Sequence, residues 1–330
     1  SVNGSTFNVG SNLDIGFAAG ADENSVEVSD QGTVTVGGGV TVGNFGATNS
    51  AVVKGGASLS ISSGSGLKIG IASGGNSMLV SGNGTSVDSQ GRVYVGDDNP
   101  DAVDNSLTVT DQAELSVSNS FLIMGLGGSG NSMTVSGGAT ASAGDGYIGY
   151  RDTADNNSLT VEGSGSLVLD SLCLGNQAGS DSNTLTVTGA GSTATVDGEL
   201  KVGDSGGNNS ARVDNGAQLS ASRISIGADS GGSHNSLVAD GAGTLVDATA
   251  GTLDSRVGHS DNASYNAVLV TNGAAMRTYG LTIGDTATSH SNTFTVTGTG
   301  SSLKNIGTIH ISAGGTEGNT LDVSNGTVDS

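Results

Sequence analysis

Basic residues are scarce in this chain of 330 residues. Ten Lys and Arg stand against 31 Asp and Glu, which gives a formal net charge of −21 at pH 7. Such an acidic excess, with no basic run, excludes nucleic acid and anionic lipid surfaces as expected partners. The one cysteine excludes an internal disulfide framework and a zinc ribbon. The longest apolar runs, such as Phe121 to Met124, are far shorter than the roughly 20 residues of a membrane span, so we expect no membrane insertion.

Proline and aromatic side chains are equally rare, whereas glycine is abundant: the chain has one Pro, no Trp, five Tyr and five Phe, but 58 Gly. The hydrophobic share of 34% is low enough to suggest disorder, yet the apolar residues follow a regular order. An Asn followed by alternating apolar residues recurs along the chain, with five consecutive spacings of 26 residues. Its positions are Asn24, Asn49, Asn76, Asn105, Asn131, Asn157, Asn183, Asn209, Asn235, Asn266, Asn292 and Asn319.

Each repeat predicts three short strands. The residues two and four positions after the Asn are almost all apolar, as in NSLTV (105–109), and this period of two places them on one face of a strand. A second alternating segment ends in Gly, as in LIMG (122–125). Between the two lie a corner of Gly, Asn or Asp residues and another short strand. No helical periodicity occurs, which excludes βαβ folds.

Equivalent strands of successive repeats must pair in parallel, because each repeat has the same order of strands and nearly the same length. The sequence therefore predicts an all-β fold, a single-stranded right-handed parallel β-helix of about twelve three-strand coils. We expect one domain over residues 1–330 without an internal boundary. The longer coils that start near Asn76 and Asn235 should carry their extra residues in protruding loops.

The asparagine that begins each coil points inward in this arrangement. Stacked side-chain amides would satisfy one another and the buried backbone at the corner. We therefore expect a structural ladder formed by Asn105, Asn131, Asn157, Asn183 and Asn209.

Units of the type NSLTVTGxGSxLxVxxxLxVGxxGxGN resemble those of bacterial surface β-helices, above all the passenger regions of autotransporter adhesins and related Gly-, Asn- and Ser-rich exoproteins. The resemblance covers nearly the whole chain, and it implies secretion or a place on the bacterial cell surface, with adhesion or self-association. Its motif is structural, and fold does not fix function. We expect a non-enzymatic structural or adhesive protein without cofactors, whose partner is itself or a surface glycan or protein.

Two other functions stay open. A carbohydrate-active β-helix enzyme, either a polysaccharide lyase or a hydrolase, needs carboxylates or a calcium cluster beside a base, whereas the six Arg fall at different positions of the coil. An ice-binding adhesin would present a flat array of hydroxyls, and Thr is also an ordinary exposed strand residue. The outward hydroxyl pairs are Ser106 with Thr108, Ser132 with Thr134, Ser158 with Thr160, and Thr184 with Thr186.

A stripe of apolar and aromatic residues is predicted on the outside of the Gly-terminated strands. It contains Tyr94, Ile123, Tyr147 and Cys173, with Tyr150 just past the Gly. Exposed apolar patches often mark contacts, so we expect an interaction surface here, with the Cys173 thiol exposed.

An acidic loop is the one candidate for a metal site. The segment GDDNPDAVDN brings Asp97, Asp98, Asp101 and Asp104 into a loop that is longer than its equivalents. Clustered carboxylates suit Ca²⁺, and a solvated acidic loop is the alternative.

The two ends of the sequence fall at equivalent points of the repeat, Asn3-Gly4 and Asn325-Gly326. Matching ends could continue each other's strand ladders, which would give head-to-tail filaments. The alternative is that the sequence is an excerpt of a longer passenger region.

Overall fold

The structure, a computed structural model, describes residues 1–118, 120–315 and 317–330. It confirms the expected fold class, an all-β parallel β-solenoid. Within the described residues every strand pair is parallel and no helix occurs. The first strand of each turn occurs thirteen times in this part of the chain, so the solenoid has about thirteen turns rather than twelve.

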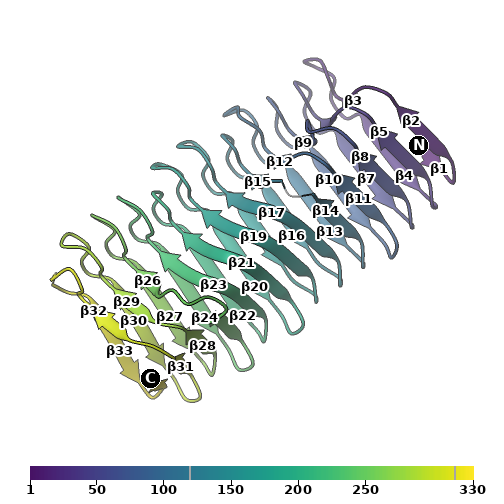
Figure 1. Ribbon diagram of the computed structural model, residues 1–330. Coiled ribbons are helices and arrows are strands. Elements are labelled where there is room, and N and C mark those ends of the chain that lie inside the picture. The colour runs from purple at the N-terminus through teal and green to yellow at the C-terminus, as the bar shows by residue number, and fades with distance from the viewer. Residues whose placement is uncertain (119, 316) are drawn as a thin grey trace. The chain divides into compact units, whose positions relative to one another are not determined.

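The chain consists of two compact units, unit 1 (Ser1–Leu169) and unit 2 (Asp170–Ser330). A single domain over the whole chain stays a prediction of the sequence. Figure 1 shows the strands of unit 1, from purple to teal, stacked side by side with their arrows in one direction.

The first strands of the turns in unit 1 form one parallel sheet and the other strands a second one. The first strands are β1 (Val2–Asn3), β4 (Ser25–Ser29), β7 (Ser50–Lys54), β10 (Ser77–Ser81), β13 (Ser106–Thr110), β16 (Ser132–Val135) and β18 (Ser158–Val161). The others are β2 (Thr6–Val9), β3 (Leu13–Ile15), β5 (Thr33–Val36), β6 (Val40–Val42), β8 (Ser58–Ile61), β9 (Leu67–Ile69), β11 (Ser86–Ser89), β12 (Val93–Val95), β14 (Glu114–Val117), β15 (Leu122–Met124), β17 (Thr140–Ile148) and β19 (Ser166–Leu174), which contains the junction of the units.

Unit 2 repeats the same plan. Its first strands are β20 (Thr184–Thr188), β22 (Ser210–Asp214), β24 (Ser236–Asp240), β27 (Ala267–Thr271), β30 (Thr293–Thr297) and β33 (Thr320–Ser324). Its other strands are β21 (Thr193–Val202), β23 (Gln218–Ile226), β25 (Leu245–Ala248), β26 (Ser255–Val257), β28 (Ala275–Thr278), β29 (Leu281–Ile283), β31 (Ser302–Asn305), β32 (Ile309–Ile311) and β34 (Thr327–Asp329).

Alternating burial explains why a low apolar content suffices for a core. In β13, Leu107 and Val109 are fully buried while the hydroxyl residues between and beside them are half-buried. Leu107 lies in register with Met78 of β10 and Met133 of β16, so inward side chains stack along the unit. The corner after the strand uses Asp111 and Gln112, both at positive φ, a conformation that Asp tolerates and that Gly supplies in other turns.

The ladder asparagines are buried and hydrogen-bonded to one another within each unit. Asn131, for example, accepts bonds at Oδ1 from the backbone N and the Nδ2 of Asn105, each at 3.0 Å. Its own Nδ2 donates to Oδ1 of Asn157 at 3.1 Å. In unit 2, Asn183 donates in the same way to Asn209, whose Nδ2 donates to Asn235 at 3.2 Å. All of these side chains are fully buried.

The glycine that ends the third strand of a turn is required by this ladder. Gly125 has a φ of +71°, and a Cβ built on it would lie 2.3 Å from Nδ2 of Asn157. Any larger residue would therefore collide with the buried amide as well as strain its own backbone. The recurring Gly and Asn are two halves of one packing unit.

Two details differ from the regular plan of three separate strands. In β17, β19, β21 and β23 the second and third strands run on as one, and the pairing of β21 with β23 has a register shift between Val196 and Glu199 in place of the bend. The extra residues of the longer coils lie outside the strands, in segment 96–105 after β12 and in segments 249–254 and 258–266 on either side of β26.

Candidate binding site

The expected stripe of unit 1 is in register but is mostly covered. Lys68, Tyr94 and Ile123 occupy equivalent positions of β9, β12 and β15, and Tyr147 of β17 follows them. Tyr94 is only 7% exposed and Ile123 only 3%. The expectation that these two form an exposed stripe is therefore wrong, while Tyr147 and Tyr150 are half-buried.

Side chains of neighbouring turns cover the stripe. The ammonium of Lys68 lies 5.5 Å from the centre of the Tyr94 ring, and Nη1 of Arg92 donates a hydrogen bond of 3.1 Å to the Tyr94 hydroxyl. Tyr147 packs edge-on against both Phe121 and Tyr150, with ring centres 5.9 and 4.8 Å apart. Long side chains of the same turn and of the neighbouring turn reach over the Tyr94 ring, so the surface becomes a cluster of cations and aromatic rings.

Arg92 is exposed at the edge of this cluster, with its guanidinium 4.8 Å from the Phe121 ring centre. Its hydrogen bond with Tyr94 raises the pKa of Arg92, so the side chain stays cationic. The described residues include every Lys, Arg, Asp and Glu of the chain. Of the ten Lys and Arg side chains, only those of Arg92 and Lys304 have no carboxylate oxygen within 4.0 Å of a side-chain nitrogen. Arg92 is thus a cation that the fold leaves uncompensated.

A cavity of about 390 Å³, which we call the Arg92 cavity, lies beside this guanidinium. It is formed by the bends before β9, β12 and β15 together with the outward side chains of β9 and β12. Its lining is Gly64, Ser65, Lys68, Gln90, Gly91, Arg92, Tyr94 and Ser120.

A second cavity of about 260 Å³ adjoins the first in unit 1, because Ser65 and Lys68 line both. We call it the Phe17 cavity after the phenylalanine in its lining, whose side chain is 60% exposed. Its other polar lining side chains are those of Asn12, Asp14, Thr41 and Asn44.

The carboxylates of the acidic loop have different surroundings. Asp97 is buried and pairs with Lys68 at 2.7 Å, whereas Asp98 pairs with Arg151. Asp101 and Asp104 are exposed. No three of the described His, Cys, Asp and Glu residues, these four among them, are grouped so as to hold a metal ion. Basic side chains, and not each other, are the partners of the first two carboxylates, so this geometry gives the calcium hypothesis no support.

Cys173 lies in unit 2 and is only 6% exposed, so the expectation of an exposed thiol is also wrong. Its Sγ lies 3.8 Å from Oδ1 of Asn176. Burial raises the pKa of the Cys173 thiol well above its usual range, and the nearby carboxylate of Asp204 adds to the effect. A thiol held neutral in this way is a poor nucleophile.

Ion pairs, rather than aromatic rings, cover the same region of unit 2. Glu199 accepts hydrogen bonds of 2.5 Å each from Arg223 and from the hydroxyl of Ser225. Burial raises the pKa of Glu199, but these two bonds together with the charges of Arg223 and Lys201 outweigh it, and the net shift is downward.

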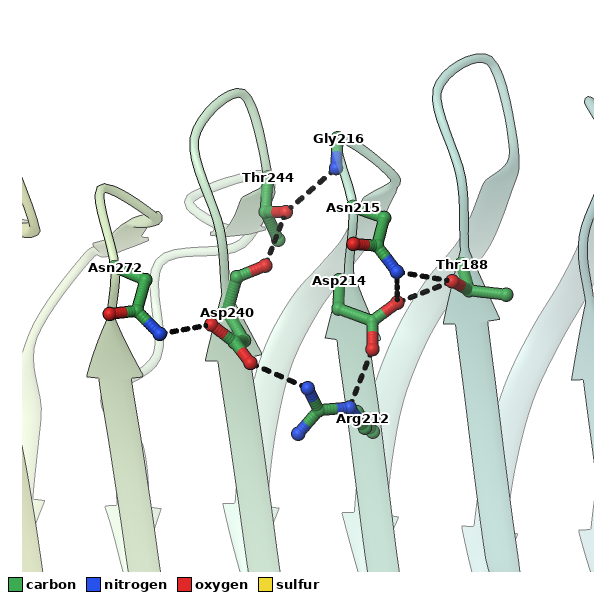
Figure 2. A network of polar contacts seen from close by, with 8 residues as sticks. All are labelled: Thr188, Arg212, Asp214, Asn215, Gly216, Asp240, Thr244 and Asn272. Carbon is green, nitrogen blue, oxygen red and sulfur yellow. Dashed lines mark hydrogen bonds and ion pairs between the residues drawn. The ribbon is translucent and has the colours of Figure 1, made fainter.

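A polar network on the first strands of unit 2 interrupts the expected hydroxyl columns (Figure 2). Arg212 donates bonds of 2.5 Å to Asp214 of its own strand and to Asp240 of the next. Asn272 donates to Asp240 at 2.8 Å, and Asp214 also accepts a bond from Thr188. The carboxylates of Asp214 and Asp240 each accept bonds from more than one residue, so the network links neighbouring turns of unit 2.

The hydroxyl pairs themselves are in register where unit 1 contains them. Ser106 and Thr108 of β13 lie opposite Ser132 and Thr134 of β16, which lie opposite the pair on β18. Leu79 of β10 ends the column on one side.

Among the described residues, no helix is long and apolar enough to cross a membrane.

Sequence reasoning missed the role of Arg92, which lies in a bend rather than in a repeated strand position. Its one signal was a basic residue with no acidic neighbour in the segment GRVYVG (91–96).

No protein-family model matches the chain, and no curated protein matches it. Among solved structures, the chain is similar to a TibC-catalysed, hyper-glycosylated TibA fragment (TibA55-350) known from its crystal structure. The two share 16% sequence identity with a TM-score of 0.40, over 99% of this chain and 100% of that one.

Proposed function

We propose that this chain is a non-enzymatic adhesive protein, secreted or held at the bacterial cell surface, that attaches to a surface glycan or protein through the Arg92 cavity. The observation that carries the proposal is the guanidinium of Arg92, which lines a polar cavity without a carboxylate partner in a chain of net charge −21. A cation that the fold does not neutralise favours a ligand that brings the opposite charge.

The walls of the cavity support binding because they are fixed in advance. Leu67, Val93 and Leu122, the first residues of β9, β12 and β15, are fully buried, and they anchor the bends that line the cavity. Backbone bends held in place before the ligand arrives lose little conformational entropy on binding.

The engagement of the acidic and phenolic groups supports binding rather than catalysis. A lyase or hydrolase aims a general acid and a base at one reacting bond. Asp97, whose partner Lys68 lines the cavity, is buried, and the Tyr94 hydroxyl accepts a hydrogen bond from Arg92. These groups are bonded to other side chains, so they do not point together at the bond of a substrate.

Attachment of the fluorescently labelled protein to bacterial and animal cells tests the proposal. We expect saturable attachment that Arg92→Gln abolishes. Arg277→Gln is the matched control, since Arg277 is an exposed arginine of unit 2 that is paired with Asp247, and it should leave attachment unchanged.

Three other results would contradict the proposal or change its partner. Absence of saturable attachment to every surface would contradict adhesion, and release of an unsaturated sugar from a polysaccharide would establish the lyase alternative. A scattering mass that rises with protein concentration would identify a second copy of the chain as the partner.

A further inference from the structure

We infer that the Arg92 and Phe17 cavities together bind an oligosaccharide, with a carboxylate-bearing sugar at Arg92 and a neutral sugar beside Phe17. The inference rests on the proposed function, since it names the chemical class of the ligand for the same surface.

The charge of the first cavity selects a single negative charge. Two cations line it, Lys68 and Arg92, and the ion pair with Asp97 neutralises the first. The remaining positive charge matches a carboxylate, whereas a phosphate monoester carries roughly −1.5 to −2 at pH 7. The planar guanidinium also matches the two oxygens of a carboxylate geometrically.

The neutral lining of the first cavity selects a polyhydroxylated ligand. Ser65, Gln90 and Ser120 bring two hydroxyls and one amide, which both donate and accept hydrogen bonds. The volume of about 390 Å³ lies at the lower end of the range for small-molecule sites. A single sugar ring with a carboxylate satisfies the size, the charge and the hydrogen-bonding groups together.

Two glycines, Gly64 and Gly91, line the Arg92 cavity. A Cβ on Gly91 would lie 2.5 Å from the carbonyl oxygen of Gly64, so the absence of a side chain lets the bends of adjacent turns meet. A Cβ on Gly64 would meet nothing within 4 Å, which makes Gly64 an open position at the edge of the cavity.

The second cavity extends the site by one neutral residue. It shares Ser65 and Lys68 with the first, so a ligand can pass from one to the other. The exposed ring of Phe17 offers an apolar face on which a sugar ring can pack. Asp14 lines this cavity and would repel a second carboxylate. The preferred ligand therefore alternates acidic and neutral sugars rather than repeating an acidic one.

Isothermal titration calorimetry with three defined probes tests this assignment. The first is a hyaluronan tetrasaccharide, in which glucuronate alternates with N-acetylglucosamine. The second is the chitin tetrasaccharide, which keeps N-acetylglucosamine and lacks the carboxylate. The third is inorganic phosphate. We expect binding of the hyaluronan probe, weakened by added NaCl, and at least about ten-fold weaker binding of the other two.

Two variants locate the binding in the cavity. Arg92→Gln should weaken binding of the hyaluronan probe about ten- to hundred-fold, as expected for a charge-assisted hydrogen bond. Gly64→Glu brings a carboxylate to the edge of the cavity and should weaken it similarly, whereas Gly64→Gln, of equal size and no charge, should not. Because Gly64 is exposed and has space around it, this pair reports on the site even if Arg92→Gln unfolds.

The outcomes separate this inference from the proposed function. Equal binding of the chitin and hyaluronan probes, or equal effects of Gly64→Glu and Gly64→Gln, would overturn the carboxylate assignment. No binding of any probe, with cell attachment that still depends on Arg92, would overturn the sugar assignment and leave adhesion standing. If the unmodified protein neither attaches to cells nor binds any probe, both the sugar assignment and the proposed adhesive function are overturned.

Discussion

Replacing the ladder residue Asn131 with leucine tests whether stacked amides hold the turns of unit 1 together. Leucine has the same number of side-chain heavy atoms and the same branch at Cγ, but it removes the acceptor of the Asn105 backbone N–H, a bond of 3.0 Å in a fully buried position. It also removes the bond of 2.9 Å that Nδ2 of Asn131 donates to the carbonyl of Ala102. One orphaned buried donor costs about 1–3 kcal/mol and a lost bond about 1 kcal/mol more, so we expect a loss of about 2–4 kcal/mol.

Urea denaturation followed by far-ultraviolet circular dichroism measures this loss, and amide hydrogen exchange at Asn105 localises it. Asn83→Leu is the control, because Asn83 is an exposed corner residue and its replacement should change the free energy of unfolding by less than about 0.5 kcal/mol. A loss for Asn131→Leu no larger than that of the control would refute the ladder as a source of stability.

Asn131→Asp adds a test of sign. The aspartate keeps the acceptor but is buried without a cation, so its pKa should be higher in the folded protein than the value of about 3.9 in an unfolded chain. A group of this kind stabilises below the unfolded pKa and loses that contribution as the pH rises through the folded pKa. The variant should therefore approach the unmodified protein near pH 3 to 4 and fall behind it towards pH 7, and a constant difference would contradict the burial of this side chain.

Three further predictions concern other positions. Gly125→Ala should lower the melting temperature, because the positive φ alone costs about 1–2 kcal/mol for an alanine and the new Cβ would meet the Asn157 amide. Gly10→Ala is the control and should leave the melting temperature unchanged, because Gly10 has open space around it. Equal melting temperatures of the two variants would contradict the packing of Gly125 against Asn157. Glu199 has a lowered pKa in the folded protein, so its stabilisation is present above the unfolded value of about 4.3 and is lost as the pH falls through the folded one. The difference in unfolding free energy between the unmodified protein and Glu199→Gln should therefore be constant from pH 7 to 5 and close below about pH 4. The buried Cys173 thiol should react with a colorimetric thiol reagent at pH 8 only after denaturation, and rapid reaction of the folded protein would show that the site opens.

The repeated positions could be read from the sequence because each obeys a local rule that recurs about every 26 residues. Period-two alternation fixes which side chains of β13 face inward, and equal unit length requires β13 to pair in parallel with β10 and β16. Inward burial of Asn131 and the glycine at position 125 follow from the same register. These features depend only on the spacing along the chain, so one sequence was enough to predict them.

What lies over the outer face was decided by the tertiary structure. Tyr94 and Cys173 occupy outward positions, as their spacing requires, yet both are buried, and Lys68 of the adjacent turn lies over the Tyr94 ring. The pairing of Asp97 with Lys68 and the packing of Arg92 over the Phe121 ring are likewise contacts between turns at positions that do not repeat. Periodicity determines the face to which a side chain belongs, but its partner depends on the length, charge and direction of side chains one turn away, and these are distant in sequence and follow no repeat.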